Sequence, residues 1–134
     1  MNEHGTFCTV VNCMDGRIQI PVNDFLRKKC KADFVDTITE AGPIRFLSKK
    51  NKSCEYKNIL KRIDVSINKH GSKSLAVVAH QGCAGNDIKD KKQIKQIHKS
   101  IKNLKRKYPK IELLGLWVHQ DEENAEWIVE EVAK

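Results

Sequence analysis

The chain has 134 residues, of which 40% are hydrophobic, so it can bury a core and does not have the composition of a disordered protein. Its formal net charge is +8, and no apolar run approaches the roughly 18 residues that a membrane-spanning helix requires. No linker is long enough to divide the sequence, so we expect one domain over residues 1–134.

The cysteines indicate a reducing environment. There are five of them at irregular spacings, whereas a disulfide framework requires an even and dense set. The N-terminal residues also lack the apolar segment of a secretory signal peptide. We therefore expect a cytoplasmic protein that does not associate with a membrane and whose thiols are free to bind a metal ion.

Strands and helices are predicted to alternate in the first half of the chain. Residues 6–12 (TFCTVVN) form a β-branched run that predicts a buried strand. Apolar residues at helical spacing predict a short helix after Pro21. Residues 33–39 (DFVDTIT) predict a second strand, and residues 56–67 carry an amphipathic helical stripe. The pair His70-Gly71 is typical of a helix C-terminus.

The second half continues the alternation. Residues 74–79 (SLAVVA) and 111–118 (IELLGLWV) predict a third and a fourth strand, separated by a lysine-rich helix. A last helix is predicted over residues 121–133, because three acidic residues at its start suit the positive end of a helix dipole. Its inward residues would be Ala125, Ile128, Val129 and Val132. Trp117 and Trp127 are expected to pack.

The positive charge is concentrated in the lysine-rich segment. Its apolar residues are spaced 3, 4, 3 and 4 apart and form one helical stripe, which leaves the lysines on the opposite face. The stripe consists of Ile94, Ile97, Ile101, Leu104 and Tyr108. The pattern favours a solvated helix face over a nucleic-acid contact, since the chain has neither the aromatic pattern nor the finger spacing of nucleic-acid-binding modules.

Alternating apolar strands and helices are typical of an α/β three-layer sandwich with a mainly parallel sheet, here of four to five strands. In such folds ligands bind outside the carboxyl ends of the strands. Three predicted strands end at Cys13, His80 and His119, and the remaining one delivers Glu40 and Gly42 to the same edge. We therefore expect these residues near the functional site.

Three of the residues at strand ends have the chemistry of a metal site. His80-Gln81-Gly82-Cys83 is an H-x-x-C element directly after a strand, and Cys13 lies at the matching end of another strand. Two thiolates and one imidazole suit zinc, and three protein ligands leave a fourth position open, as in catalytic zinc sites. The alternative is that these are ordinary buried residues.

Two motifs resemble those of β-class carbonic anhydrases. Cys13-Met14-Asp15-Gly16-Arg17 resembles the family's C-x-D-x-R element, and His80-Gln81-Gly82-Cys83 resembles its H-x-x-C. Both occur in the family's order, and a looser resemblance extends from about Phe7 to His119. The resemblance implies a β-carbonic-anhydrase-like fold and a zinc lyase that interconverts carbon dioxide and bicarbonate. It assigns Cys13, His80 and Cys83 as zinc ligands.

The resemblance also implies roles for Asp15 and Arg17. Asp15 would accept a hydrogen bond from zinc-bound hydroxide and orient it toward the substrate, while Arg17 would hold Asp15 by a bidentate pair. The alternative for both residues is a polar turn with a surface ion pair. His119 is a candidate proton shuttle, because an unperturbed histidine titrates near neutrality. The alternative for His119 is a capping or surface role.

The match is incomplete, which leaves the substrate open. Glu40-Ala41-Gly42-Pro43 resembles the family's Asn-Ala-Gly-Asn loop only at its Ala-Gly centre. Carbonyl sulfide or carbon disulfide hydrolysis on the same site is therefore an alternative, as is a non-catalytic zinc- or anion-binding protein. A basic nucleic-acid-binding protein is the least favoured class. We expect a small-molecule substrate and a homodimer or higher homo-oligomer.

Overall fold

The computed structural model describes residues 5–49 and 53–134. In this part of the chain, strands in the order β2-β1-β3-β4-β5 form one five-stranded sheet. All neighbouring pairs are parallel except β4 and β5, which are antiparallel. The strands are β1 (Phe7–Cys13), β2 (Phe34–Glu40), β3 (Ser74–His80), β4 (Glu112–Gln120) and β5 (Trp127–Ala133). The prediction of a mainly parallel α/β sheet is confirmed.

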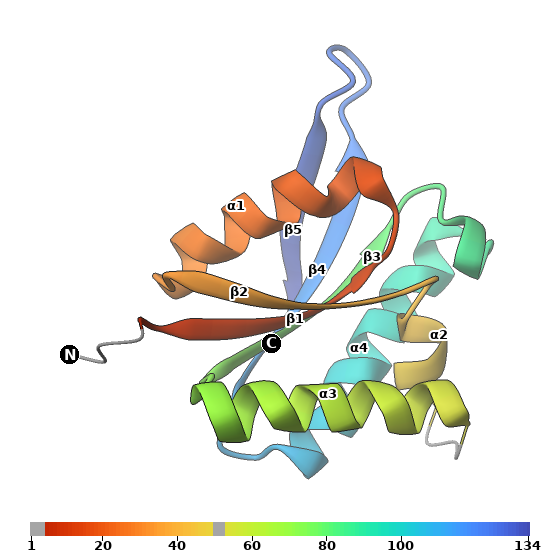
Figure 1. The fold of residues 1–134 in the computed structure, drawn as a ribbon. Helices are drawn as coiled ribbons and strands as arrows, with labels where there is room; N and C mark the ends of the chain where they lie inside the picture. Colours follow the sequence, from red (N-terminus) through yellow and green to blue (C-terminus); the bar gives the residue numbers. More distant parts are fainter. Residues whose placement is uncertain (1–4, 50–52) are drawn as a thin grey trace.

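Helices cover both faces of the sheet, as Figure 1 shows. Helix α1 (Gln19–Cys30) lies on one face, while α2 (Ile44–Leu47), α3 (Cys54–His70) and α4 (Asp90–Lys107) lie on the other. Each face has its own core of buried aliphatic side chains. Two short 3-10 helices, η1 (Gly16–Ile18) and η2 (Ala84–Asn86), follow β1 and β3 at the carboxyl edge of the sheet.

The helix boundaries follow the sequence closely, with one shift. Helix α1 begins at Gln19, before Pro21 rather than after it. The shift is tolerated because Pro21 still lies in the first turn, where no backbone N–H is needed. Helix α3 ends as predicted at His70, and Gly71 adopts the left-handed conformation with φ 68°.

The prediction of a helix over residues 121–133 is wrong. Residues 127–133 form strand β5, which pairs with β4. The acidic segment before it forms a turn, in which the carboxylate of Asp121 accepts hydrogen bonds from the backbone N–H groups of Glu123 and Asn124. Ala125 then takes a positive φ of 58°, which reverses the chain. Without β5, the backbone groups along one edge of β4 would have no partner strand, and pairing with β5 supplies their hydrogen bonds. The spacing of apolar residues within the segment does not reveal this pairing.

The lysine-rich segment forms helix α4 with the expected polarity. Ile97, Ile101 and Leu104 are buried against the sheet, whereas the lysines are exposed. The predicted solvated face is therefore present. Among the residues that the structure describes, no helix has the length and apolar character needed to cross a membrane.

Candidate metal centre

Three side chains converge at the carboxyl edge of the sheet. Cys13 ends β1, His80 ends β3, and Cys83 follows in the loop before η2. Their ligand atoms all lie within 4.8 Å of one another, and all three residues are buried. The two sulfur atoms are 3.7 Å apart. Adjacent parallel strands that end together thus bring residues 70 positions apart in sequence into contact.

The imidazole of His80 is oriented with one nitrogen toward this cluster. Its Nδ1 lies 2.8 Å from the carbonyl oxygen of Gln81 and donates a hydrogen bond to it. Its Nε2 is buried and has no hydrogen-bond partner among the described residues. The bond at Nδ1 leaves the lone pair at Nε2, which is the usual arrangement of a metal-binding histidine.

The two thiols are electronically different. The two sulfurs lie within hydrogen-bond distance, and the hydrogen bond between them lowers the pKa of Cys13 despite its burial. The backbone N–H groups of Gly42 and Asp15 lower it further. The same hydrogen bond, together with burial, raises the pKa of Cys83 above its usual range. The lowered pKa of Cys13 favours the thiolate, which is the form of cysteine that binds a metal ion.

Asp15 and Arg17 form a close pair beside the cluster. The guanidinium donates from Nη2 to Oδ2 of Asp15 at 2.6 Å and from Nε to Oδ1 at 3.0 Å. These bonds lower the pKa of Asp15 to about 2. The carboxylate is only 18% exposed, and its Oδ2 lies 3.8 Å from Nε2 of His80. An ionised carboxylate thus lies beside the imidazole of the cluster.

Three features of these residues suit a zinc ion. Two zinc–sulfur bonds of about 2.3 Å at a tetrahedral angle would separate the sulfurs by about 3.8 Å, close to the 3.7 Å present. The unpartnered Nε2 of His80 supplies the nitrogen ligand. Two thiols and one imidazole also form a donor set that zinc prefers over magnesium or calcium.

Comparison with known proteins identifies the family. The chain matches the model of the family described as "Putative carbonic anhydrase" over residues 3–133. It belongs to that family. None of the curated proteins compared with the chain matches it.

Solved β-carbonic anhydrases have the same fold. β-Carbonic anhydrase isoform I from Trichomonas vaginalis superposes with a TM-score of 0.57 at 16% identity, over 91% of this chain and 80% of that chain. One of two tetrameric β-carbonic anhydrases from Sordaria macrospora gives 0.58 at 10% identity, over 92% and 79%. The β-carbonic anhydrase CcaA gives 0.54 at 14% identity, over 98% and 86%. At these identities the likeness shows the fold alone.

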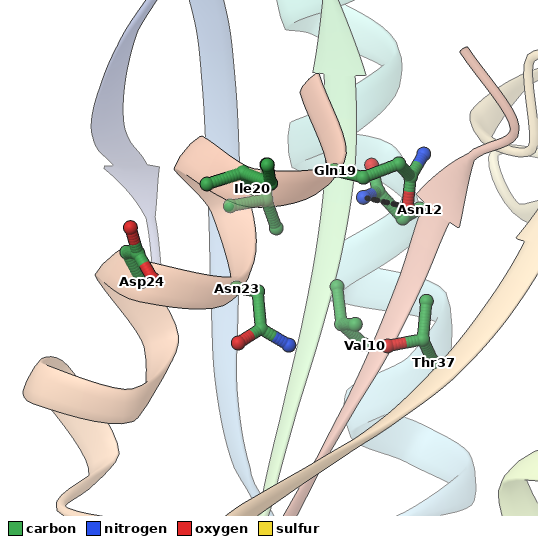
Figure 2. Close-up of a pocket in the computed structure, with 8 residues that line it drawn as sticks. Val10, Asn12, Gln19, Ile20, Asn23, Asp24 and Thr37 are labelled. Atoms are coloured by element: carbon green, nitrogen blue, oxygen red, sulfur yellow. Dashed lines mark hydrogen bonds between the residues drawn. The ribbon is translucent and has the colours of Figure 1, made fainter. Parts of the chain in front are cut away.

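Gln19 fixes the loop that carries the C-x-D-x-R element of this family member. Its Nε2 donates to the carbonyl oxygens of Cys13 at 2.7 Å and Asp15 at 2.8 Å. Figure 2 shows Gln19 also accepting a hydrogen bond from Asn12, at 3.4 Å. Both amides line a pocket of about 270 Å³ between α1 and strands β1 and β2, which no metal-cluster residue lines. Gln19 therefore holds the loop through two of its backbone carbonyl groups.

The loop after β2 packs directly on the loop after β3. A Cβ atom added to Gly85 would lie 2.6 Å from the carbonyl carbon of Ala41, and one added to Gly42 would lie 2.7 Å from the carbonyl carbon of Gly85. The close approach lets Gly42 donate to Cys13, while the backbone N–H groups of Gly85 and Asn86 donate to Cys83. The two glycines therefore set the position of both thiols.

Gly85→Ala is expected to lower the free energy of unfolding by about 1–3 kcal/mol, because backbone atoms must move to admit the methyl group. It should also weaken zinc binding, since Cys83 lies two residues away. Urea unfolding and zinc titration check both effects. Gly16→Ala is the matched control, because nothing lies within 4 Å of its added Cβ atom. Equal stability of the two variants would contradict the close packing.

His119 lies near the same edge but on the other face of the sheet. Its neighbour Val118 pairs with His80 and packs in the core on the α1 side. Because successive side chains alternate in a strand, His119 faces away from the cluster. It lies 3.5 Å from a carboxylate oxygen of Glu130 on β5.

Two contacts with the cluster could not be predicted from sequence. The amide of Gln93 on α4 donates to the carbonyl oxygen of His80 at 2.9 Å. The ring of Trp127 on β5 lies over the guanidinium of Arg17 and edge-on to His80. Neither residue belongs to a motif, and the second contact requires a strand where the sequence predicted a helix.

Proposed function

We propose that this chain catalyses the reversible, zinc-dependent hydration of carbon dioxide to bicarbonate. One observation carries the proposal: three buried ligands converge beside a carboxylate that Arg17 holds in place. Membership of the carbonic anhydrase family supports the same reaction. We also propose that residues 1–134 act as one zinc-binding domain.

Cys13, His80 and Cys83 would hold the zinc ion. When bound, zinc makes hydroxide available from water near neutral pH. Asp15 is the group of this chain that would position the nucleophile, because its Oδ2 already lies 3.8 Å from Nε2 of His80. As an ionised carboxylate it accepts a hydrogen bond and thereby directs an oxygen lone pair toward the carbon of the substrate. Hydroxide and carbon dioxide combine to bicarbonate, and a proton passes to buffer.

Arg17 would keep Asp15 available for that role. Its guanidinium occupies both carboxylate oxygens, so the carboxylate is oriented and remains ionised. The pair would also prevent Asp15 from becoming a fourth protein ligand. An open coordination position is what separates a catalytic zinc site from a structural one.

Stopped-flow measurement of carbon dioxide hydration by zinc-loaded protein tests the proposal. We expect saturable activity that rises between pH 6 and 9. Carbonyl sulfide and carbon disulfide, assayed in parallel, test the alternative substrates of the same site. Protein that contains one zinc ion per chain but hydrates no carbon dioxide would overturn the proposal.

His119→Ala is expected to leave the hydration rate within about twofold of wild type. The reason is that the strand geometry directs this imidazole away from the cluster, so we propose that protons leave by another route. Rates in dilute and in concentrated buffer give the comparison, because loss of a shuttle lowers the rate most in dilute buffer. A large defect that added imidazole rescues would restore His119 as the shuttle.

We further propose a cytoplasmic homo-oligomer. The described cysteines are free thiols, which suits a reducing compartment. The Sordaria macrospora relatives are tetrameric. Strand β2 lies at the edge of the sheet in this chain and carries Phe34, which is 51% exposed. Light scattering after size-exclusion chromatography measures the mass in solution, and a mass of 15.3 kDa, that of one chain, would contradict the proposal.

A further inference from the structure

Strand β5 places an aromatic ring beside the Asp15–Arg17 pair. Trp127 is the first residue of β5 and pairs with Gln120 on β4. Its partly buried ring packs against the core on the α1 side, the face that also contains Cys13 and Cys83. Figure 1 shows the β4–β5 hairpin beside the start of α1, where the chain arrives from the loop of Asp15 and Arg17.

The ring makes two contacts at the site. The guanidinium carbon of Arg17 lies over the ring, 5.2 Å from its centroid. The imidazole of His80 meets the same ring edge-on, at 6.4 Å between centroids and an interplanar angle of 76°. Trp127 therefore touches both the residue that holds Asp15 and one member of the metal cluster.

Arg17 has little else to restrain it. Its side chain is 55% exposed, and among the described residues it makes one hydrogen bond besides those to Asp15, from Nη2 to the carbonyl oxygen of Gly82 at 3.4 Å. Asp15 belongs to the same short loop, so this ion pair alone cannot fix the loop relative to β3. The guanidinium side of the pair is open to water, which weakens the hold of Arg17 on the carboxylate. Besides the long hydrogen bond to Gly82, the ring from β5 supplies a second restraint from outside the loop.

We propose that Trp127 is a positioning residue, which holds the Arg17 guanidinium by a cation–π contact and thereby keeps Asp15 directed at the metal cluster. This inference rests on the proposed hydration activity. The competing explanation is that Trp127 only shields the core on the α1 side. The two differ in what they need from residue 127, because positioning needs an aromatic face whereas shielding needs only apolar volume.

Two substitutions separate these requirements. Trp127→Phe keeps an aromatic face, and Trp127→Leu keeps apolar volume without one. Phe46→Leu is the matched control, since Arg45 lies 4.5 Å over the ring of Phe46 in a cation–π contact on α2, whose core is on the other face of the sheet. All four proteins are prepared with zinc, and zinc content and unfolding midpoint are recorded for each.

Two readouts then test the positioning role. The first is kcat and KM for carbon dioxide hydration. We expect Trp127→Leu to lower kcat about three- to fivefold with KM and zinc content unchanged, and Trp127→Phe and Phe46→Leu to stay within about twofold of wild type. The second is the NMR signal of the Arg17 Nε–Hε group, which the ring current of Trp127 displaces. That signal should move toward its free value in Trp127→Leu only.

The outcomes separate this inference from the proposed function. If Trp127→Leu keeps both the wild-type kcat and the wild-type Arg17 signal, Trp127 only shields the core and the inference is overturned. If the Leu and Phe variants lose the same amount of activity, the aromatic face is not needed and the inference also fails. If wild-type protein hydrates no carbon dioxide, the proposed function fails, while the Arg17 signal still decides whether the ring holds the guanidinium.

Discussion

Cys83→Ser is expected to abolish stable zinc binding and hydration activity together. A serine hydroxyl does not ionise near neutral pH, so the site would keep one thiolate and one imidazole in place of two thiolates and one imidazole. Substitution of groups that merely support zinc ligands typically costs 10- to 100-fold in affinity, and removal of a ligand should cost more. Elemental analysis after dialysis should find about one zinc ion per wild-type chain and almost none in the variant.

Cys54→Ser is the matched control for this experiment. Cys54 is an exposed free thiol at the start of α3, and it belongs neither to the metal cluster nor to either sequence motif. It should bind zinc as wild type does. Circular dichroism of the zinc-free proteins distinguishes lost ligation from lost folding. Full zinc occupancy in Cys83→Ser would remove Cys83 from the ligand set and, with it, the basis of the proposed reaction.

The parallel part of the fold could be predicted because each of its strands is marked by the residues within that strand. The strands that became β1 and β3 are almost entirely buried, and their continuous apolar runs reveal that directly. Strand β5 could not be predicted, because its residues have the spacing of a helix as well as that of a strand. Its structure depends on hydrogen bonds to β4, and the turn at Asp121 begins with the same acidic residues that favour a helix N-terminus.

The site shows the same difference between features marked by a local sequence pattern and features that depend on contacts between distant segments. Cys13 and His80 could be brought together from sequence, because parallel strands that end in register deliver their last residues to one edge. The hydrogen bonds from Gln19 to the loop and the contact of the Trp127 ring with Arg17 could not be predicted from the sequence. Gln19 acts on two backbone carbonyls of a tight loop, and Trp127 reaches Arg17 only because β5 runs antiparallel to β4. Neither contact leaves a pattern in the sequence.

Asp15→Asn is expected to lower hydration activity about 100-fold or more while zinc content stays at one ion per chain. The amide cannot offer two acceptor oxygens to Arg17, so the side chain would lose its orientation as well as its charge. A small misplacement of a positioning group can alone cost about 100-fold in rate. Stopped-flow rates and elemental analysis on the same preparation measure the two quantities. Asp24→Asn, which removes an exposed carboxylate on α1, is the control.

The pH dependence of this variant shows whether Asp15 contributes by orienting the nucleophile or by changing its own protonation state. Arg17 holds the pKa of Asp15 at about 2, so the carboxylate is ionised throughout the pH 6–9 range of the assay and adds no inflection there. The activity of Asp15→Asn should therefore rise with pH as in wild type, at a lower level.

Because the folded-state pKa is depressed from about 3.9, the stabilisation from this pair is complete above that value and is lost as pH falls through about 2. The difference in unfolding free energy between wild type and Asp15→Asn should accordingly shrink over that acid range. A variant with wild-type activity would instead show that Asp15 and Arg17 form only a surface pair.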